Sequence, residues 1–139
     1  MTFAELAALH ASAFTVPRPW SEAEITDLAH APGVFVLHEA QGFCIGRALA
    51  GEAELLTLAV APAMRRQGLG GRLLSRFEDE ARRLGATQAF LEVAADNQPA
   101  LALYRGAGWE DAGRRPGYFR LAEGTSIDAL LLKKALTGS

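Results

Sequence analysis

The sequence predicts one mixed α/β domain that spans residues 1–139. Three observations predict this class. Helical and extended patterns alternate along the chain, and no repeat or long linker interrupts them. Half of the residues are hydrophobic, which is enough for one core without disulfides or metals.

Two capping boxes open the chain. The pattern Thr2–Glu5 predicts a first helix, and Ser21–Glu24 predicts a second that runs to about His30. Two prolines between residues 14 and 20 exclude a helix there, so that segment is expected to be a loop.

Three extended segments follow the second helix. Short apolar runs predict strands, and residues 40–42 form a hairpin turn between the first two. The third run is almost wholly apolar, which is typical of a central strand covered on both faces. The expected strands are residues 34–37, 43–50 and 54–60, and Pro62 ends the last one.

A long amphipathic helix comes next and ends at Gly85. The pairs Glu78–Arg82 and Asp79–Arg83 are expected on its solvent side. Its apolar stripe contains Leu69, Leu73, Leu74, Phe77, Ala81 and Leu84.

The remaining segments complete a mixed sheet. Residues 89–93 read as a strand and 99–105 as a short helix, with further strands from Trp109 onward and over 127–136. The strands on either side of the long helix are expected to lie parallel.

Composition excludes several classes of function. A net charge of −2 argues against a general nucleic-acid binder. Cys44 is the single cysteine, and the three histidines lack metal-ligand spacing, so no metal is expected. No histidine partner is evident for Cys44, which disfavours an acyl-cysteine route. Without a signal peptide or a membrane-spanning run, the expected location is the cytoplasm, with no membrane partner.

The sharpest local feature is the glycine-rich turn Arg65–Gly71, placed between a buried strand and the long helix. Bare backbone N–H groups, a helix N-terminus and two arginines suit a phosphate or pyrophosphate. Its ending differs from that of a P-loop, and its glycine spacing differs from a dinucleotide fingerprint. A plain turn with a charged rim stays open on this segment alone.

This turn resembles the coenzyme-A signature of the GNAT N-acetyltransferase superfamily. The match covers about residues 54–110 and continues at the expected distances through Leu91-Glu92-Val93, Asn97, Ala102-Leu103-Tyr104 and Gly108-Trp109. The resemblance implies acetyl-CoA as co-substrate and a central pair of strands that splay apart around it. The residues that it assigns to the cofactor are Leu58, Ala59, Val60, Arg65, Arg66, Gln67, Gly68, Leu69, Gly70, Gly71 and Asn97.

Within that superfamily the chain looks most like the RimI type, the bacterial ribosomal-protein-alanine N-acetyltransferases. Pro19-Trp20-Ser21-Glu22 and the stretch 113–119 carry this closer match. The chain opens directly on a helix, so the family's usual first edge strand is expected to be missing or truncated. Pro116-Gly117 and Phe119 also depart from the subfamily pattern, near the positions expected to receive the acceptor.

Acetyl transfer to an amine needs a base and an acid. Glu92 lies in an apolar run and matches the family's base, although a structural ion pair with a nearby arginine is the alternative. Tyr104 is the candidate acid, and a half-buried structural aromatic is the alternative. Trp20, Tyr118 and Phe119 are expected either to line the acceptor groove or to be ordinary core residues.

The resemblance implies an N-terminal α-amine of a protein as acceptor, such as a ribosomal protein. A lysine, another terminus or a small amine is the alternative acceptor. A non-catalytic acyl-CoA-binding module is the alternative function. The expected oligomeric state is a monomer or weak dimer.

Overall fold

The computed structural model describes residues 2–13, 20–62, 68–121 and 124–136. These residues form four helices and six strands, close to the segments predicted from the sequence. The helices are α1 (Phe3–Ala13), α2 (Glu22–Ala29), α3 (Leu69–Arg83) and α4 (Gln98–Gly106). The strands are β1 (Val34–Glu39), β2 (Gly42–Leu49), β3 (Glu52–Val60), β4 (Gln88–Ala94), β5 (Glu110–Arg120) and β6 (Ser126–Ala135).

The strands form one mixed sheet in the order β1-β2-β3-β4-β6-β5. Only β3 and β4 pair in parallel, as predicted for the strands that flank the long helix. All other pairs are antiparallel. Among the described residues no strand precedes α1, and β1 is one edge of the sheet, as the sequence indicated.

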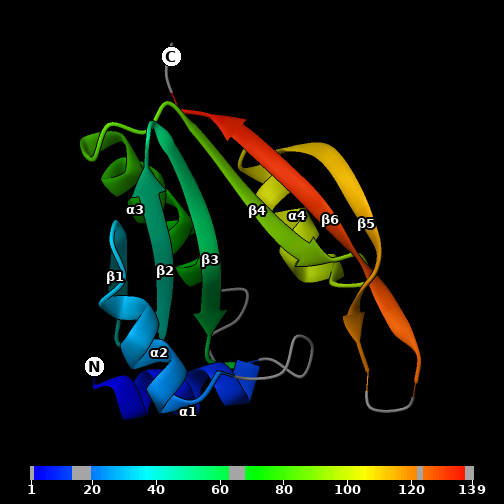
Figure 1. The fold of residues 1–139 in the computed structure, drawn as a ribbon, viewed down its shortest axis with the longest axis horizontal. Coiled ribbons are helices and arrows are strands. Elements are labelled where there is room, and N and C mark those ends of the chain that lie inside the picture. The colour runs from blue at the N-terminus through cyan, green and yellow to red at the C-terminus, as the bar shows by residue number, and fades with distance from the viewer. Residues whose placement is uncertain (1, 14–19, 63–67, 122–123, 137–139) are drawn as a thin grey trace.

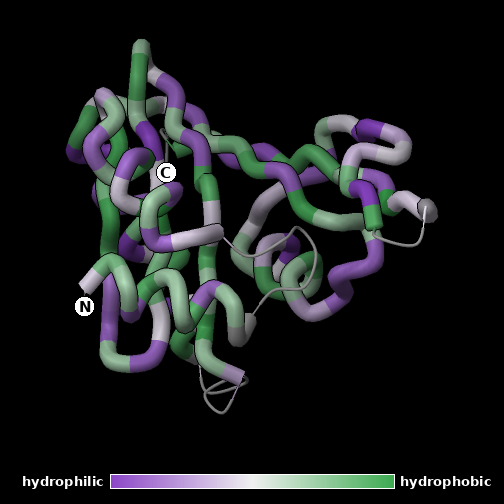
Figure 2. Tube along the Cα trace, turned by 60° about the horizontal axis from the view of Figure 1, so that its bottom comes forward, coloured by the Kyte–Doolittle hydropathy of each residue, from purple (hydrophilic) through white to green (hydrophobic). Residues whose placement is uncertain are grey.

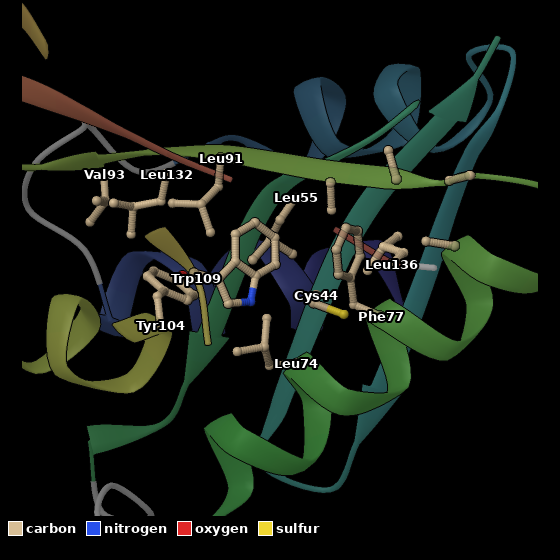
Figure 3. Packing of buried hydrophobic residues seen from close by; sticks show 14 of the residues in the cluster. Cys44, Leu55, Leu74, Phe77, Leu91, Val93, Tyr104, Trp109, Leu132 and Leu136 are labelled. Carbon is tan, nitrogen blue, oxygen red and sulfur yellow. The ribbon is translucent and has the colours of Figure 1, made fainter. Parts of the chain in front are cut away.

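Helices cover both faces of the sheet (Figure 1). One core cluster joins α3 and α4 to the sheet, with Tyr104 and Trp109 at its centre (Figure 3). A second cluster joins α1 and α2 to β2 and β3 on the opposite face. Hydrophobic and hydrophilic stretches alternate along the chain (Figure 2). None of the described helices has the length and apolar character needed to cross a bilayer.

The two parallel strands stay together over only three residue pairs. Residues 52–54 of β3 pair with 88–90 of β4, and the strands then diverge, so that a V opens between them (Figure 1). Beyond that point β4 continues to pair with β6 and β3 with β2. The splayed pair that the family resemblance implied is therefore confirmed.

A β-bulge lies where the divergence begins. Gly46 of β2 faces Leu55, and Ile45 faces Thr57, which leaves Leu56 without an opposite residue. Leu55 therefore packs toward α3, whereas Thr57 faces α1. A bulge bends its strand and increases the local twist, which accounts for β3 turning away from β4 here. The sequence prediction did not include this bulge.

Glu78 corrects a prediction about the long helix. It was expected on the solvent side with Arg82, but its side chain is only 8% exposed. Its carboxylate accepts hydrogen bonds from Lys134 Nζ at 2.7 Å and from Trp109 Nε1 at 3.2 Å, while Arg82 lies 3.7 Å away. Lys134 also donates to the Ala107 carbonyl at 2.7 Å. This buried network ties α3 to both β6 and the end of α4, because a buried charge needs such partners.

The prediction of an ion pair between Asp79 and Arg83 is also wrong. Arg82 contacts Asp79 and Arg83 contacts Glu80, in both cases three residues apart rather than four. Leu84, which was placed in the apolar stripe, is 44% exposed, because it caps the helix beyond the last packed turn.

We expect Lys134→Met to lower the free energy of unfolding by about 3 kcal/mol, because it leaves the Glu78 carboxylate buried without its main charge partner. Urea denaturation followed by circular dichroism measures the change. The double variant Glu78→Gln/Lys134→Met removes the unpaired charge and should recover roughly half of the loss. A double variant as unstable as Lys134→Met alone would contradict the assignment.

Candidate active site

The V between β3 and β4 exposes a free strand edge inside the molecule. Apart from the bulged Leu56, residues 55–60 pair with β2 on one side, and no described strand pairs with them on the other. The backbone N–H and C=O groups on that side need partners. An extended ligand that carries amide groups can supply them in strand fashion. Leu58, Ala59 and Val60, the predicted cofactor residues of β3, lie on this free stretch.

The N-terminus of α3 lies at the end of the free edge. A Cβ atom at Gly70 would lie 3.9 Å from side-chain atoms of both Leu58 and Val60, and 3.3 Å from Leu103 Cδ2. The first turn of α3 therefore closes against β3 and α4, and glycine permits that approach. Leu69 and Gly71 of the predicted set belong to the same turn.

The residue that precedes α3 has a left-handed conformation. Gly68 is its N-cap with φ +80°, no side chain caps the helix, and the first turn contains no acidic residue. Free N–H groups and the helix dipole therefore favour an anion here. A free edge that ends at such a turn fits a pantetheine arm followed by a pyrophosphate. Arg65, Arg66 and Gln67 lie outside the described residues.

Glu92 lies on β4 beside the V, on the face of the sheet that carries α1 and α2. Its neighbours Leu91 and Val93 point into the opposite core, so Glu92 and Phe90 share the α1 face. Its side chain is 22% exposed. Its Oε2 atom is buried without a hydrogen-bond partner among the described residues.

The alternative role for Glu92 was a structural ion pair with an arginine. In the structure this pair is only a long contact. Arg115 Nη1 lies 3.7 Å from Glu92 Oε1, and the arginine side chain is 60% exposed. Its guanidinium also lies over the Tyr118 ring, 5.2 Å from the centroid. An exposed pair of this kind stabilises little, and it leaves the other carboxylate oxygen free.

Tyr104 lies on the opposite face, in the core between α4 and the sheet. It is 7% exposed rather than half-buried, and its ring packs against Trp109 at 6.1 Å (Figure 3). Burial raises the pKa of its phenol, and the nearby Cys44 thiol adds to the increase. The hydroxyl therefore keeps its proton at neutral pH. Glu92 and Tyr104 therefore lie on opposite faces of the sheet, and no described contact joins them.

Asn97, which was predicted to contact the cofactor, has a structural role at the start of α4. It is the N-cap of α4, and its Oδ1 accepts a hydrogen bond from the Ala100 N–H at 3.2 Å. This cap fixes the start of the helix that carries Tyr104 and Leu103, directly after β4.

The three aromatic candidates for the acceptor groove lie in two places. Tyr118 and Phe119 contact each other on β5 with ring centroids 5.1 Å apart, and Tyr118 is 49% exposed. Trp20 is half-buried and packs on the α1–α2 cluster. No described contact joins it to the β5 pair.

Sequence reasoning missed His10. Its side chain is 1% exposed, its Nε2 lies 3.2 Å from Thr57 Oγ1, and its Nδ1 accepts a hydrogen bond from the Trp20 N–H at 3.1 Å. Its ring stacks on Trp20 with centroids 4.9 Å apart. Burial lowers the pKa of His10 to about 4, with an opposing contribution from Glu24. A histidine in the last turn of a short helix gives no sequence signal of such contacts.

The acetyltransferase (GNAT) family matches residues 3–109 of the chain. The chain belongs to this family. The match covers β3, the turn before α3, β4 and α4, so it includes all the elements that border the V.

Curated relatives match a part of this GNAT domain. A segment of 90 residues is 38% identical to the [ribosomal protein bS18]-alanine N-acetyltransferase of Escherichia coli K12, over 65% of this chain and 60% of that protein. A segment of 78 residues is 41% identical to N-alpha-acetyltransferase RimI of Mycobacterium tuberculosis, over 56% and 48% respectively. An uncharacterised Mycobacterium leprae protein is 42% identical over 83 residues, which is 21% of its length. The chain thus matches less than two thirds of each of these proteins.

Solved structures share the whole fold. The ribosomal-protein-S18-alanine N-acetyltransferase of Escherichia coli superposes with a TM-score of 0.84 at 27% identity, over 99% of this chain and 89% of that one. Ard1 of Thermoplasma volcanium gives 0.81 at 24% identity, over 98% and 93%, and shows the fold alone. The predicted resemblance to GNAT enzymes of the RimI type is confirmed.

Two glycines at the start of α3 should respond to alanine in opposite ways. Gly68→Ala should lower the free energy of unfolding by about 1 kcal/mol, because a side chain is strained at positive φ. Gly71→Ala should leave it unchanged or raise it by roughly 0.5 kcal/mol, since the new methyl meets Leu103 at an ordinary distance in a helix. Thermal or urea unfolding without ligand measures both. Equal effects would contradict the left-handed cap.

The buried His10 should make stability depend on pH. Its pKa falls from 6.5 in the unfolded chain to about 4 in the fold, so between these values only the unfolded chain binds the proton. The contribution of His10 to stability is therefore constant above about pH 6.5 and decreases as the pH falls, by about 3 kcal/mol at most. Urea midpoints measured across this range, with His10→Gln as control, test this. An identical pH dependence in both proteins would contradict it.

Proposed function

We propose that this chain transfers the acetyl group of acetyl-CoA to the N-terminal α-amine of a protein. The proposed acceptor begins with alanine, as the names of the relatives indicate. One observation carries the proposal: the buried, unpartnered Oε2 of Glu92 stands beside the free edge of β3. A buried carboxylate oxygen without a partner is costly. An acceptor ammonium or amine bound at the V would supply the missing partner.

The chain's own groups can hold acetyl-CoA, which supplies an activated acetyl thioester. The free backbone of residues 58–60 pairs with the amides of the pantetheine arm. Gly68 to Gly71, with Arg65, Arg66 and Gln67, surround the pyrophosphate at the start of α3. Asn97 borders the same ligand from the start of α4.

Glu92 acts as the base, directly or through a water molecule. An α-amine has a pKa of about 7.7–8.0, so roughly a tenth of it is neutral near pH 7. A lysine side chain, at about 10.4, is neutral in only a few parts in ten thousand. A carboxylate suffices for the first acceptor and is poorly matched to the second, which favours an N-terminus.

Tyr104 acts as the acid from the other face of the sheet. Its raised pKa keeps the phenol protonated, so it can donate to the sulfur that leaves the acetyl group. A backbone N–H near Val60 provides the oxyanion donor. Base and acid thus approach the reacting atoms from opposite faces, and neither obstructs the other.

The relatives' names indicate the acceptor. The E. coli protein is named as an alanine N-acetyltransferase of ribosomal protein bS18, and the M. tuberculosis protein as an N-alpha-acetyltransferase. For this chain we propose the same class of acceptor, with Trp20, Tyr118 and Phe119 lining its groove. We further propose that it works in the cytoplasm as a monomer or weak dimer, with no metal, nucleic-acid or membrane partner.

The test uses purified protein, acetyl-CoA and short peptides, with release of free CoA as the readout. The panel contains an alanine-first bS18 peptide, peptides with other first residues, and one with a blocked terminus and a free lysine. We expect turnover on the alanine-first peptide. Glu92→Gln and Tyr104→Phe should each lower kcat by about 10²- to 10⁴-fold, the usual contribution of acid–base groups.

The controls separate reaction from acceptor. Calorimetry with acetyl-CoA should give similar affinities for the wild type and Glu92→Gln, because the carboxylate faces the acceptor side. Turnover on the lysine peptide alone would overturn the N-terminal acceptor. Tight acetyl-CoA binding without turnover on any amine would favour the non-catalytic binding module.

A further inference from the structure

We propose that His10 is a positioning residue that fixes the β3 edge and the acceptor-side Trp20 relative to each other. This inference rests on the proposed function and adds to its site a residue from α1. The observation that motivates it is one buried imidazole whose two nitrogens contact Thr57 of β3 and Trp20, the residue before the N-cap of α2.

The contacts define the tautomer. Nδ1 accepts a hydrogen bond from the Trp20 N–H, so it carries no proton. In the neutral ring the proton therefore lies on Nε2, which donates to Thr57 Oγ1 at 3.2 Å. Each nitrogen thus has one defined role. The side chain is 1% exposed, so it does not reach reacting atoms itself.

Thr57 occupies a sensitive place on β3. It is the first residue after the unpaired Leu56, and it precedes residues 58–60, which hold the cofactor in the proposed function. A hydrogen bond to its hydroxyl fixes the strand just beyond the bulge. A small change in the backbone dihedral angles of Thr57 would move the free edge, because it would turn the strand residues that follow.

Trp20 receives both a hydrogen bond and a stacking contact. Its backbone N–H donates to His10, and its indole stacks on the imidazole at 4.9 Å with an interplanar angle of 12°. The next residue, Ser21, is the N-cap of α2. His10 therefore sets where the chain enters α2 and where the indole lies on the α1 face, the face that Glu92 shares.

Two amide variants separate the two contacts. His10→Asn places an amide oxygen near the Nδ1 position and keeps the acceptor for Trp20, but it loses the donor to Thr57. His10→Gln places an amide N–H near the Nε2 position and keeps the donor to Thr57, but it loses the acceptor for Trp20. Loss of one buried hydrogen bond corresponds to about a tenfold change in an equilibrium constant.

We therefore expect His10→Asn to weaken acetyl-CoA binding about tenfold, with the peptide KM nearly unchanged. His10→Gln should raise the peptide KM about tenfold, with acetyl-CoA affinity nearly unchanged. Both should keep the wild-type shape of the pH profile of kcat/KM from about pH 6 to 9, since His10 neither gives nor takes a proton in the reaction. Equal effects of the two variants on both ligands would overturn the proposal.

Thr57 provides an independent pair of variants should the histidine variants fold poorly. Thr57→Val removes the hydroxyl and should weaken acetyl-CoA binding as His10→Asn does, whereas Thr57→Ser should restore wild-type affinity. Wild-type affinity in Thr57→Val would overturn the link to the cofactor strand. Acetyl-CoA affinity is measured by calorimetry without any acceptor, so this half of the test stands even if no peptide is turned over.

Discussion

One unpaired residue in β3 determines the geometry on which the site depends. At Leu56 the register with β2 slips, and the pairing with β4 has ended two residues earlier, at Glu54. A parallel sheet that continued here would satisfy its own backbone groups and leave no room for a ligand. Because the strand bends instead, a row of backbone donors and acceptors remains free in the interior. The binding edge is thus a consequence of an interrupted ladder.

The bulge also decides which side chains face which layer. Before it, Leu55 packs with α3, and after it Leu58 does so, although the two are three residues apart. Thr57 is turned to α1 and meets His10. Two adjacent residues of β3 therefore contact different layers of the fold. Leu58 packs on the face of α3, whose N-terminus borders the site, and Thr57 contacts α1 on the acceptor face.

The sequence was sufficient for the element order, the parallel pair and the V, because these follow from periodicity and from the family motif. It was insufficient where contacts with distant parts of the chain determine whether a side chain is buried. Glu78 has the spacing of a solvent-exposed ion pair, yet Lys134 and Trp109 from distant segments bury it. His10 gave no signal, because its partners lie 47 and 10 residues away. Motif positions predicted Glu92 and Tyr104, but not that they occupy opposite faces.

The buried polar side chains differ in whether their hydrogen bonds are complete. Both carboxylate oxygens of Glu78 accept hydrogen bonds, and both ring nitrogens of His10 have partners, so these groups hold parts of the fold in place. One oxygen of Glu92 has a long contact with Arg115, and the buried oxygen, Oε2, has no hydrogen-bond partner among the described residues. A fold that completes the hydrogen bonds of Glu78 and His10 but leaves this oxygen without one retains a local cost in stability. That cost is offset when an N–H group of a ligand donates a hydrogen bond to Oε2. The carboxylate therefore favours binding of a nitrogen donor over the unliganded state.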